Sequence, residues 1–404
     1  MSNLVILNQW VIRNLTLTDM NKNIEFSLNK FSAVPNLLRE VPSVNLASSN
    51  FEIDLSRLFH HYYTDSYGIA PPDPNHGNFE YLNFLAPCTD FRFLGNGPGS
   101  SSGKKRNISY DLGQAFCRYF LYEFCNVTYF AHIDKVLNAK THPAFNGLKI
   151  ERAANGFIPD YLCAEKVHQP FIAEAKGRYS SISFTNSEFQ DWREQFSRIV
   201  VKDKYGIEKK LKGYIVGTRF ATETSTRSIK SKVFAEDPET PGNEFLNDNS
   251  LGIGRGCIAI HYSRLMSKLG LNLISEALGA GFVVPNDLTF NLPVWRCNYA
   301  PLNGALFFGG YFSDSDPQMA KREDGSIFFY PNILKLGVPS PTFFGIYVPV
   351  MRQLRQACLG NWQVLSEMPE LPDSQFRASN LAWLRDGSIS GSLEFFDFIG
   401  TQQL

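Results

Sequence analysis

The chain has 404 residues, of which 44% are apolar and 34 are phenylalanine, so a disordered chain is excluded and more than one domain is expected. The formal net charge is zero, and no apolar run reaches the roughly 18 residues of a membrane-spanning helix. Seven cysteines without a CxxC pair, and an N-terminus without a basic start, predict a cytoplasmic protein with reduced thiols.

Charge is unevenly distributed along the chain. Residues 104–232 hold 22 Lys and Arg against 13 Asp and Glu, whereas the counts are 6 against 9 in residues 1–103 and 11 against 17 in residues 233–404. A basic segment between acidic flanks is typical of a unit that binds a polyanion, although lysines clustered on a solvated surface give the same counts. We therefore expect nucleic acid as a partner of the central segment.

Residues 1–103 predict a mixed, β-rich region that ends in a Gly/Ser-rich linker. The linker, residues 95–106, does not match the phosphate-binding pattern GxxxxGK[ST], because Lys105 takes the place of the hydroxyl residue. We interpret it as a domain boundary.

Residues 107–127 predict an amphipathic helix, with apolar residues at i, i+3 and i+4. Glu123 falls about 20° from Phe116, inside the apolar stripe. An acid in that position needs either a cation or an exposed last turn of the helix. Both interpretations remain open from the sequence.

The segment at residues 156–178, GFIPDYLCAEKVHQPFIAEAKGR, predicts two short strands joined by a polar turn. Side chains alternate along a strand, so Glu174 and Lys176 point to the same face. A hairpin would bring Asp160 alongside them. Two carboxylates and a lysine are costly to bury unless a further charge joins them, and a divalent cation is the natural candidate. The alternative is an exposed ion pair between Glu174 and Lys176.

A second helix is expected to begin at Ser187, which forms a capping box with Gln190. Gln195 then lies at the edge of its apolar face, where it could reach a site. A basic, turn-like stretch and a strand at residues 214–220 follow. The predicted order is helix, a strand near residues 147–151 as the first strand of the sheet, two-strand hairpin, helix and strand.

This order, with Pro159-Asp160 and Glu174-Ala175-Lys176 separated by 13 residues, resembles the PD-(D/E)XK nuclease superfamily over about residues 107–220. The resemblance implies an αβββαβ restriction-endonuclease-like core. It also implies hydrolysis of phosphodiester bonds that depends on Mg²⁺, with Mn²⁺ as a substitute ion.

The resemblance further implies the roles of individual residues. Asp160, Glu174 and the carbonyl of Ala175 would hold the metal, and Glu123 would contact it directly or through water. Lys176 would orient or help deprotonate the attacking water. Gln195 would place Lys176 or a phosphate. The basic segment offers these phosphate contacts: Lys104, Lys105, Arg106, Lys202, Lys204, Lys209, Lys210 and Lys212.

Residues 223–254 predict a linker or long loop, and residues 255–404 a separate α+β unit of no recognised family. Cys257 and His261 have the i, i+4 spacing of a thiol–imidazole pair. By analogy with multidomain nucleases, this unit would sense, recruit a partner protein or form a homo-oligomer, as in effectors of bacterial antiviral defence or mobile elements.

The sequence therefore predicts a multidomain α/β protein whose central domain, residues 104–222, is a Mg²⁺-dependent DNA endonuclease. Three alternatives stay open. The same fold could cut RNA, the central domain could bind nucleic acid without cutting it, or Cys257 and His261 could serve a thiol enzyme.

Overall fold

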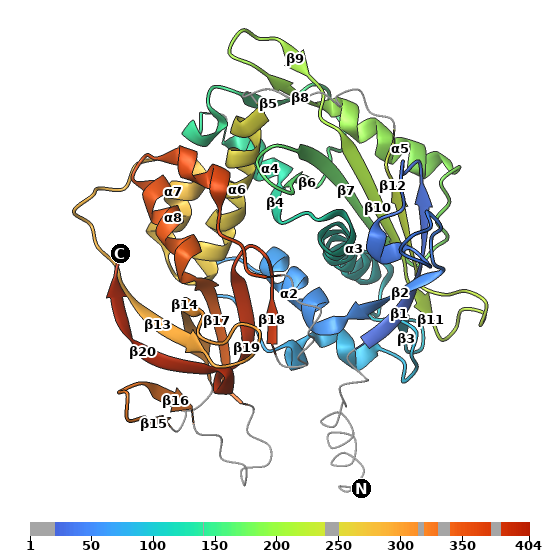
Figure 1. Ribbon diagram of the computed structural model, residues 1–404. Coiled ribbons are helices and arrows are strands. Elements are labelled where there is room, and N and C mark those ends of the chain that lie inside the picture. The colour runs from blue at the N-terminus through green and yellow to red at the C-terminus, as the bar shows by residue number, and fades with distance from the viewer. Residues whose placement is uncertain (1–20, 140, 239–249, 314–318, 330–339, 373–380) are drawn as a thin grey trace, which may run out of the picture.

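The computed structural model describes residues 21–139, 141–238, 250–313, 319–329, 340–372 and 381–404 (Figure 1). Helices and mixed β-sheets place the protein in the α/β class. Of the helices in these ranges, none combines the length and apolar character needed to cross a membrane.

A seven-stranded sheet forms the centre of the structure, in the order β2-β1-β12-β10-β7-β6-β4. The pairs β1/β12 and β7/β10 are parallel, and the other neighbours are antiparallel. Its strands in chain order are β1 (Asn21–Asn29), β2 (Asn50–Asp54), β4 (Tyr129–His132), β6 (Tyr161–Ala164), β7 (Pro170–Arg178), β10 (Gly213–Arg219) and β12 (Lys232–Glu236).

Two helices cover opposite faces of this sheet beside β7. On one face, α3 (Ser102–Cys125) starts at the Ser101 cap and approaches β7 so closely that a Cβ on Gly177 would lie 1.7 Å from the carbonyl oxygen of Ser109. On the other face, α5 (Ser187–Gln195) packs the ring of Trp192 against Gly217 of β10. The sheet edge near residue 160 is thus enclosed by helices on both sides.

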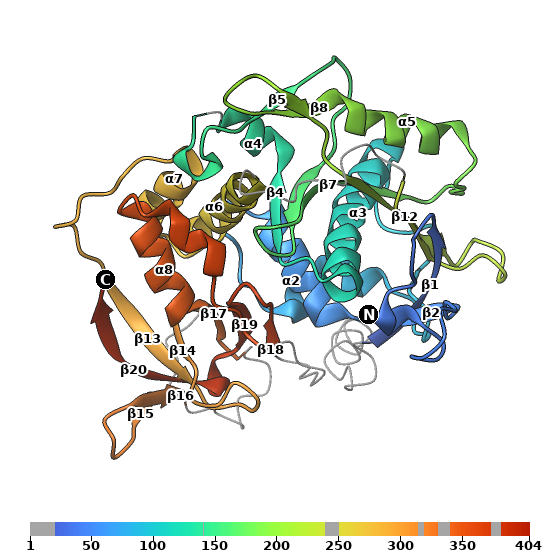
Figure 2. The same ribbon diagram turned by 45° about the horizontal axis from the view of Figure 1, so that its top comes forward.

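A second, eight-stranded sheet is built from the C-terminal part of the chain, in the order β15-β16-β20-β13-β14-β17-β19-β18. Helices α2 and α6 lie between the two sheets, α2 against β18 and α6 against β4 and β6 (Figures 1 and 2). The strands are β13 (Asn291–Cys297), β14 (Leu306–Phe312), β15 (Met319–Lys321), β16 (Ile327–Phe329), β17 (Thr342–Tyr347), β18 (Leu381–Trp383), β19 (Ser388–Ser392) and β20 (Phe396–Gln403).

The remaining elements are short strands and helices around the two sheets. They are β3 (Arg92–Phe93) paired with β11 (Ala221–Thr222), the three-stranded sheet of β5 (Lys149–Arg152), β8 (Ile199–Lys202) and β9 (Glu208–Lys209), and the helices α2 (Leu55–Ser66), α4 (Ile133–Asn138), α6 (Ser250–Lys268), α7 (Asn272–Ala280) and α8 (Val348–Cys358).

The predicted hairpin, the helix before it and the helix after it are confirmed, since β6 pairs with β7 and α3 and α5 flank them. The strand expected near residues 147–151 exists as β5, but it pairs with β8 in the small sheet rather than in the central one. The strand before the hairpin in the central sheet is β4. If α4 and β5 between β4 and β6, and β8 and β9 between α5 and β10, are left aside, then α3, β4, β6, β7, α5 and β10 follow the order helix, three strands, helix, strand.

The expected domain boundaries do not match the sheets. Strands β1 and β2, from the supposed N-terminal domain, extend the central sheet, and β12, from the supposed linker at residues 223–254, lies inside it. Residues 239–249 of that linker lie outside the described residues. A large apolar core contains residues from Ile24 to Leu384, and a second, smaller apolar cluster lies in the C-terminal sheet. Glycine- and proline-rich segments therefore marked loops within a shared core, not the ends of independent domains.

Candidate active site

Asp160 lies directly before β6, at the end of the central sheet. Its Oδ2 accepts a hydrogen bond from the amide of Ala175 at 2.8 Å, so it is held against β7. From α3, the Tyr110 hydroxyl at 2.9 Å and the Gln114 amide at 3.3 Å both donate to its Oδ1. The carboxylate is thereby fixed between the hairpin and the helix.

Glu174 and Lys176 lie on the α5 side of β7 and contact each other. The Glu174 side chain has no solvent exposure, and its Oε1 accepts a hydrogen bond from Nε2 of Gln195 at 2.7 Å and contacts Lys176 Nζ. The Lys176 ammonium also lies 4.0 Å from Oδ2 of Asp160. The structure thus brings together Asp160, Glu174, Lys176 and Gln195, four of the residues predicted from the sequence.

The negative charge of the two carboxylates is not fully balanced by the positive charges and hydrogen-bond donors around them. Burial, and after it the charge of Asp160, raises the pKa of Glu174 to about 8. Burial alone would lower the pKa of Lys176, but Glu174 and Asp160 outweigh it and raise that pKa. The Oε2 atom of Glu174 is buried without a hydrogen-bond partner in the described residues. Such a site favours the arrival of a further positive charge.

The donor set fits a hard divalent cation. Ala175 turns its amide towards Asp160, and its carbonyl lies on the same strand edge because both groups of one residue face the same neighbour. Two carboxylates, one carbonyl and water are the oxygen ligands that Mg²⁺ prefers. The described residues contain no group of three or more His, Cys, Asp or Glu side chains suited to a metal. The carbonyl and water would therefore have to complete the shell.

A pocket of about 480 Å³ lies beside Asp160. Asp160, Lys176 and Gln195 line it together with Tyr110 and His132. Lys176 is 27% exposed and Glu174 is fully buried, so of these two residues Lys176 is the one that solvent or a substrate can reach.

Glu123 does not lie at this site, contrary to the expectation. It follows Gln114 by nine residues, which is about 13 Å along a helix axis. Its Oε1 accepts a hydrogen bond from Arg57 of α2 at 2.7 Å. The helix positions that reach Asp160 are instead Tyr110 and Gln114. Their i, i+4 spacing was visible in the sequence, but their neighbour was not.

We expect Glu123→Gln to weaken folding without affecting any activity at Asp160. Loss of the half-buried charge pair with Arg57 should reduce the free energy of unfolding by about 1–3 kcal/mol. Chemical denaturation, beside the initial rate of cleavage under saturating Mg²⁺, would measure both effects. A large loss of cleavage rate in the folded variant would mean that Glu123 does take part in the reaction.

The predicted phosphate contacts fall into two groups. Lys104, Lys105 and Arg106 lie in the first turn of α3, where Lys105 Nζ donates to the carbonyl of Asn96 at 2.9 Å. The second group lies on and after the small β8/β9 sheet, where Lys204 and Lys210 are exposed, whereas the side chain of Lys209 lies outside the described residues.

Two lysines of the second group already have acidic partners. Lys202 pairs with Glu151 at 3.1 Å and Glu208 at 3.5 Å, and Lys212 pairs with Asp237 at 3.1 Å. Fewer lysines of the basic segment are therefore available to bind phosphate than its composition indicates. The residues at the start of α3 are the stronger candidates.

The geometry does not favour a thiol enzyme. Cys257 Sγ lies 3.3 Å from the carbonyl oxygen of Leu162, and His261 Nε2 lies 2.8 Å from Asp386 Oδ2. Cys257 and His261 are both buried, and burial raises the pKa of the Cys257 thiol far above its ordinary value. A protonated, inaccessible thiol is a poor nucleophile.

The chain matches no protein-family model, no curated protein and no solved structure.

Proposed function

We propose that this protein is a metal-dependent nuclease that hydrolyses phosphodiester bonds, with DNA as the first candidate substrate. The observation that carries the proposal is the convergence of Asp160, Glu174 and Lys176 at one end of the central sheet, around an under-compensated pair of carboxylates. Buried acids with strongly shifted pKa values beside a pocket are typical of functional sites.

The topology supports the same proposal. The order helix, three strands, helix, strand, with β7 parallel to β10 and antiparallel to β6, agrees with the αβββαβ core implied by the sequence resemblance. Both site strands belong to the hairpin that carries the PD and EAK residues. Fold and motif therefore both support the proposal of a restriction-endonuclease-like nuclease.

The residues suggest a division of labour. Asp160, Glu174 and the Ala175 carbonyl would hold Mg²⁺ or Mn²⁺, which supplies an acidified water and a counter-charge for the phosphate. Lys176, a half-buried cation that lines the pocket, would orient the attacking water and stabilise the negative charge of the transition state. Gln195 keeps Glu174 in place, while Tyr110 and Gln114 do the same for Asp160.

The test is incubation of purified protein with plasmid DNA, single-stranded DNA and RNA, in Mg²⁺, Mn²⁺ or EDTA, beside Asp160→Asn. We expect cleavage with either metal, none in EDTA, and none by the variant. Cleavage of RNA but not of DNA would show that RNA, the alternative substrate, is the one that the protein cuts. Salt-sensitive binding without cleavage by the wild type would favour the non-catalytic binding module.

The first turn of α3 gives a separate prediction about binding. Replacing Lys104, Lys105 and Arg106 together by glutamine should weaken DNA binding and reduce the slope of log Kd against log salt by about 2 to 3. Lys202→Gln is the matched control, because Lys202 is already paired with two glutamates. Titrations at several salt concentrations measure both slopes. Equal slopes for the triple variant and wild type would contradict this interface.

A further inference from the structure

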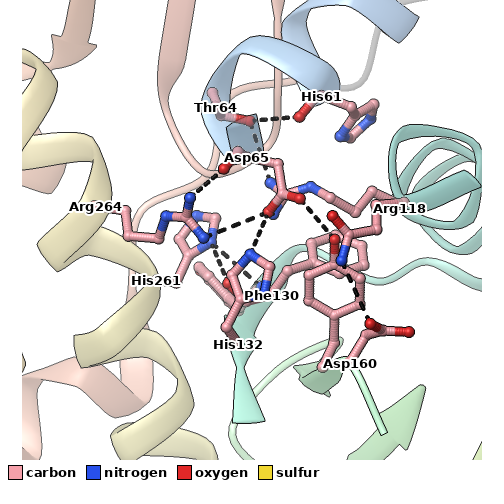
Figure 3. A network of polar contacts seen from close by, with 12 residues as sticks. His61, Thr64, Asp65, Arg118, Phe130, His132, Asp160, His261 and Arg264 are labelled. Atoms are coloured by element: carbon pink, nitrogen blue, oxygen red, sulfur yellow. Dashed lines mark hydrogen bonds and ion pairs between the residues drawn. The ribbon is translucent and has the colours of Figure 1, made fainter. Parts of the chain in front are cut away.

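A second polar cluster, centred on Asp65 of α2, lies next to the proposed site (Figure 3). Its Oδ1 receives Arg118 Nη1 of α3 at 3.0 Å and His132 Nε2 of β4 at 2.9 Å. Its Oδ2 accepts a hydrogen bond from the Tyr161 hydroxyl at 2.7 Å, and Nη1 of Arg264 of α6 lies 3.6 Å from Oδ1. Asp65 is buried, and although burial opposes it, His132 and Arg118 hold its pKa well below the usual range. It therefore stays a carboxylate.

His132 connects this cluster to the nuclease site. It is the last residue of β4, and the next amide, that of Ile133, donates to the carbonyl of Asp160 at 3.0 Å. The imidazole packs on the ring of Tyr161 with 4.8 Å between centroids and is 23% exposed. It lines both the pocket that holds Asp160 and a neighbouring cavity of about 980 Å³.

The hydrogen bond to Asp65 decides how the imidazole faces the pocket. A carboxylate accepts a proton, so Nε2 carries a hydrogen and points to Asp65, as in other carboxylate-oriented histidines. No hydrogen-bond partner for Nδ1 exists in the part of the chain that the structure describes. Nδ1 is thus left for a ligand.

The other side chains of the pocket that carry a transferable proton already donate it to a neighbouring group. The Tyr110 hydroxyl donates to Asp160, and burial raises its pKa far above the ordinary value. Lys176 contacts Glu174, and Arg152 donates to the carbonyls of Ala154 and Gly156. Among the described residues that line this pocket, His132 is therefore the side chain best placed to give up a proton.

We propose that His132 is the general acid of the proposed nuclease reaction, a role that rests on the proposed function. As the oxygen of water bonds to phosphorus and the P–O ester bond breaks, the leaving oxygen takes the proton from Nδ1 of the imidazolium. The neutral imidazole then takes a proton back from solvent. Asp65, a positioning residue, stabilises the imidazolium, and Arg118 and Arg264 hold Asp65.

The test compares two leaving groups. In an oligonucleotide that the wild type cleaves, the leaving oxygen at the mapped position is replaced by sulfur, which departs without protonation because thiols are far more acidic than alcohols. His132→Gln should cleave the oxygen substrate about 10²- to 10³-fold more slowly than wild type. On the sulfur substrate, the two proteins should have similar rates.

The controls separate this inference from the proposed function. His168→Gln, in the exposed turn at the far end of the β6/β7 hairpin, should cleave both substrates like wild type. Asp160→Asn should cleave neither. An equal loss on both substrates by folded His132→Gln, or no loss on either, would overturn the role of His132. Wild type that cut no oligonucleotide would overturn the proposed function itself.

Discussion

Lys176→Ala is expected to reduce metal-dependent cleavage about 10²- to 10³-fold, the usual effect of removing one group that stabilises transition-state charge. In the structure Lys176 contacts Glu174 and lies 4.0 Å from Asp160. The fold should persist, because without the ammonium the buried Glu174 can remain protonated. Initial rates in saturating Mg²⁺, with thermal unfolding of the same samples, would measure both effects.

A matched lysine makes this result specific. Lys166 is exposed in the turn between β6 and β7, so Lys166→Ala should retain the wild-type rate. If Lys176→Ala also retained it, Glu174 and Lys176 would be only an ion pair, and this end of the sheet would not be the catalytic site.

Glu174→Gln is expected to abolish cleavage and yet to stabilise the metal-free protein at alkaline pH. The pKa of Glu174 is raised from an ordinary 4.5 to about 8 in the folded state. Between these values the folded protein binds a proton that the unfolded chain has lost, so the free energy of unfolding falls as pH rises through this window. Glutamine cannot ionise, so the variant should lose less stability between pH 5 and 9.

Thermal unfolding in EDTA from pH 5 to 9 would measure this difference, with Glu194→Gln as the control. Glu194 is on the same helix as Gln195, and its side chain is 54% exposed. Adding Mg²⁺ or Mn²⁺ should then stabilise the wild type more at pH 8 than at pH 6, because the metal displaces the proton of Glu174. It should have little effect on Glu174→Gln. If the thermal stability of wild type and of Glu174→Gln changed with pH in the same way, Glu174 would not be the buried, proton-binding acid of this site.

The amino-acid sequence by itself determined the elements around the candidate site. The alternating pattern at residues 156–178 and the 3.6-residue period at residues 107–127 are local signals, since each depends on residues a few positions apart. They sufficed to predict the β6/β7 hairpin, the helix before it, and the approach of Asp160 to Glu174 and Lys176.

Only the tertiary structure decided which polar groups neighbour that hairpin. Glu123 meets Arg57, 66 positions earlier in the chain, and Arg264 reaches back to Asp65 across 199 positions. No periodicity relates such residues, because their contact depends on how whole elements pack. For the same reason, the sequence did not predict that β1 and β12 belong to the central sheet. The long loops next to these strands were interpreted as domain boundaries, although the apolar strands before and after each loop pack into the same core.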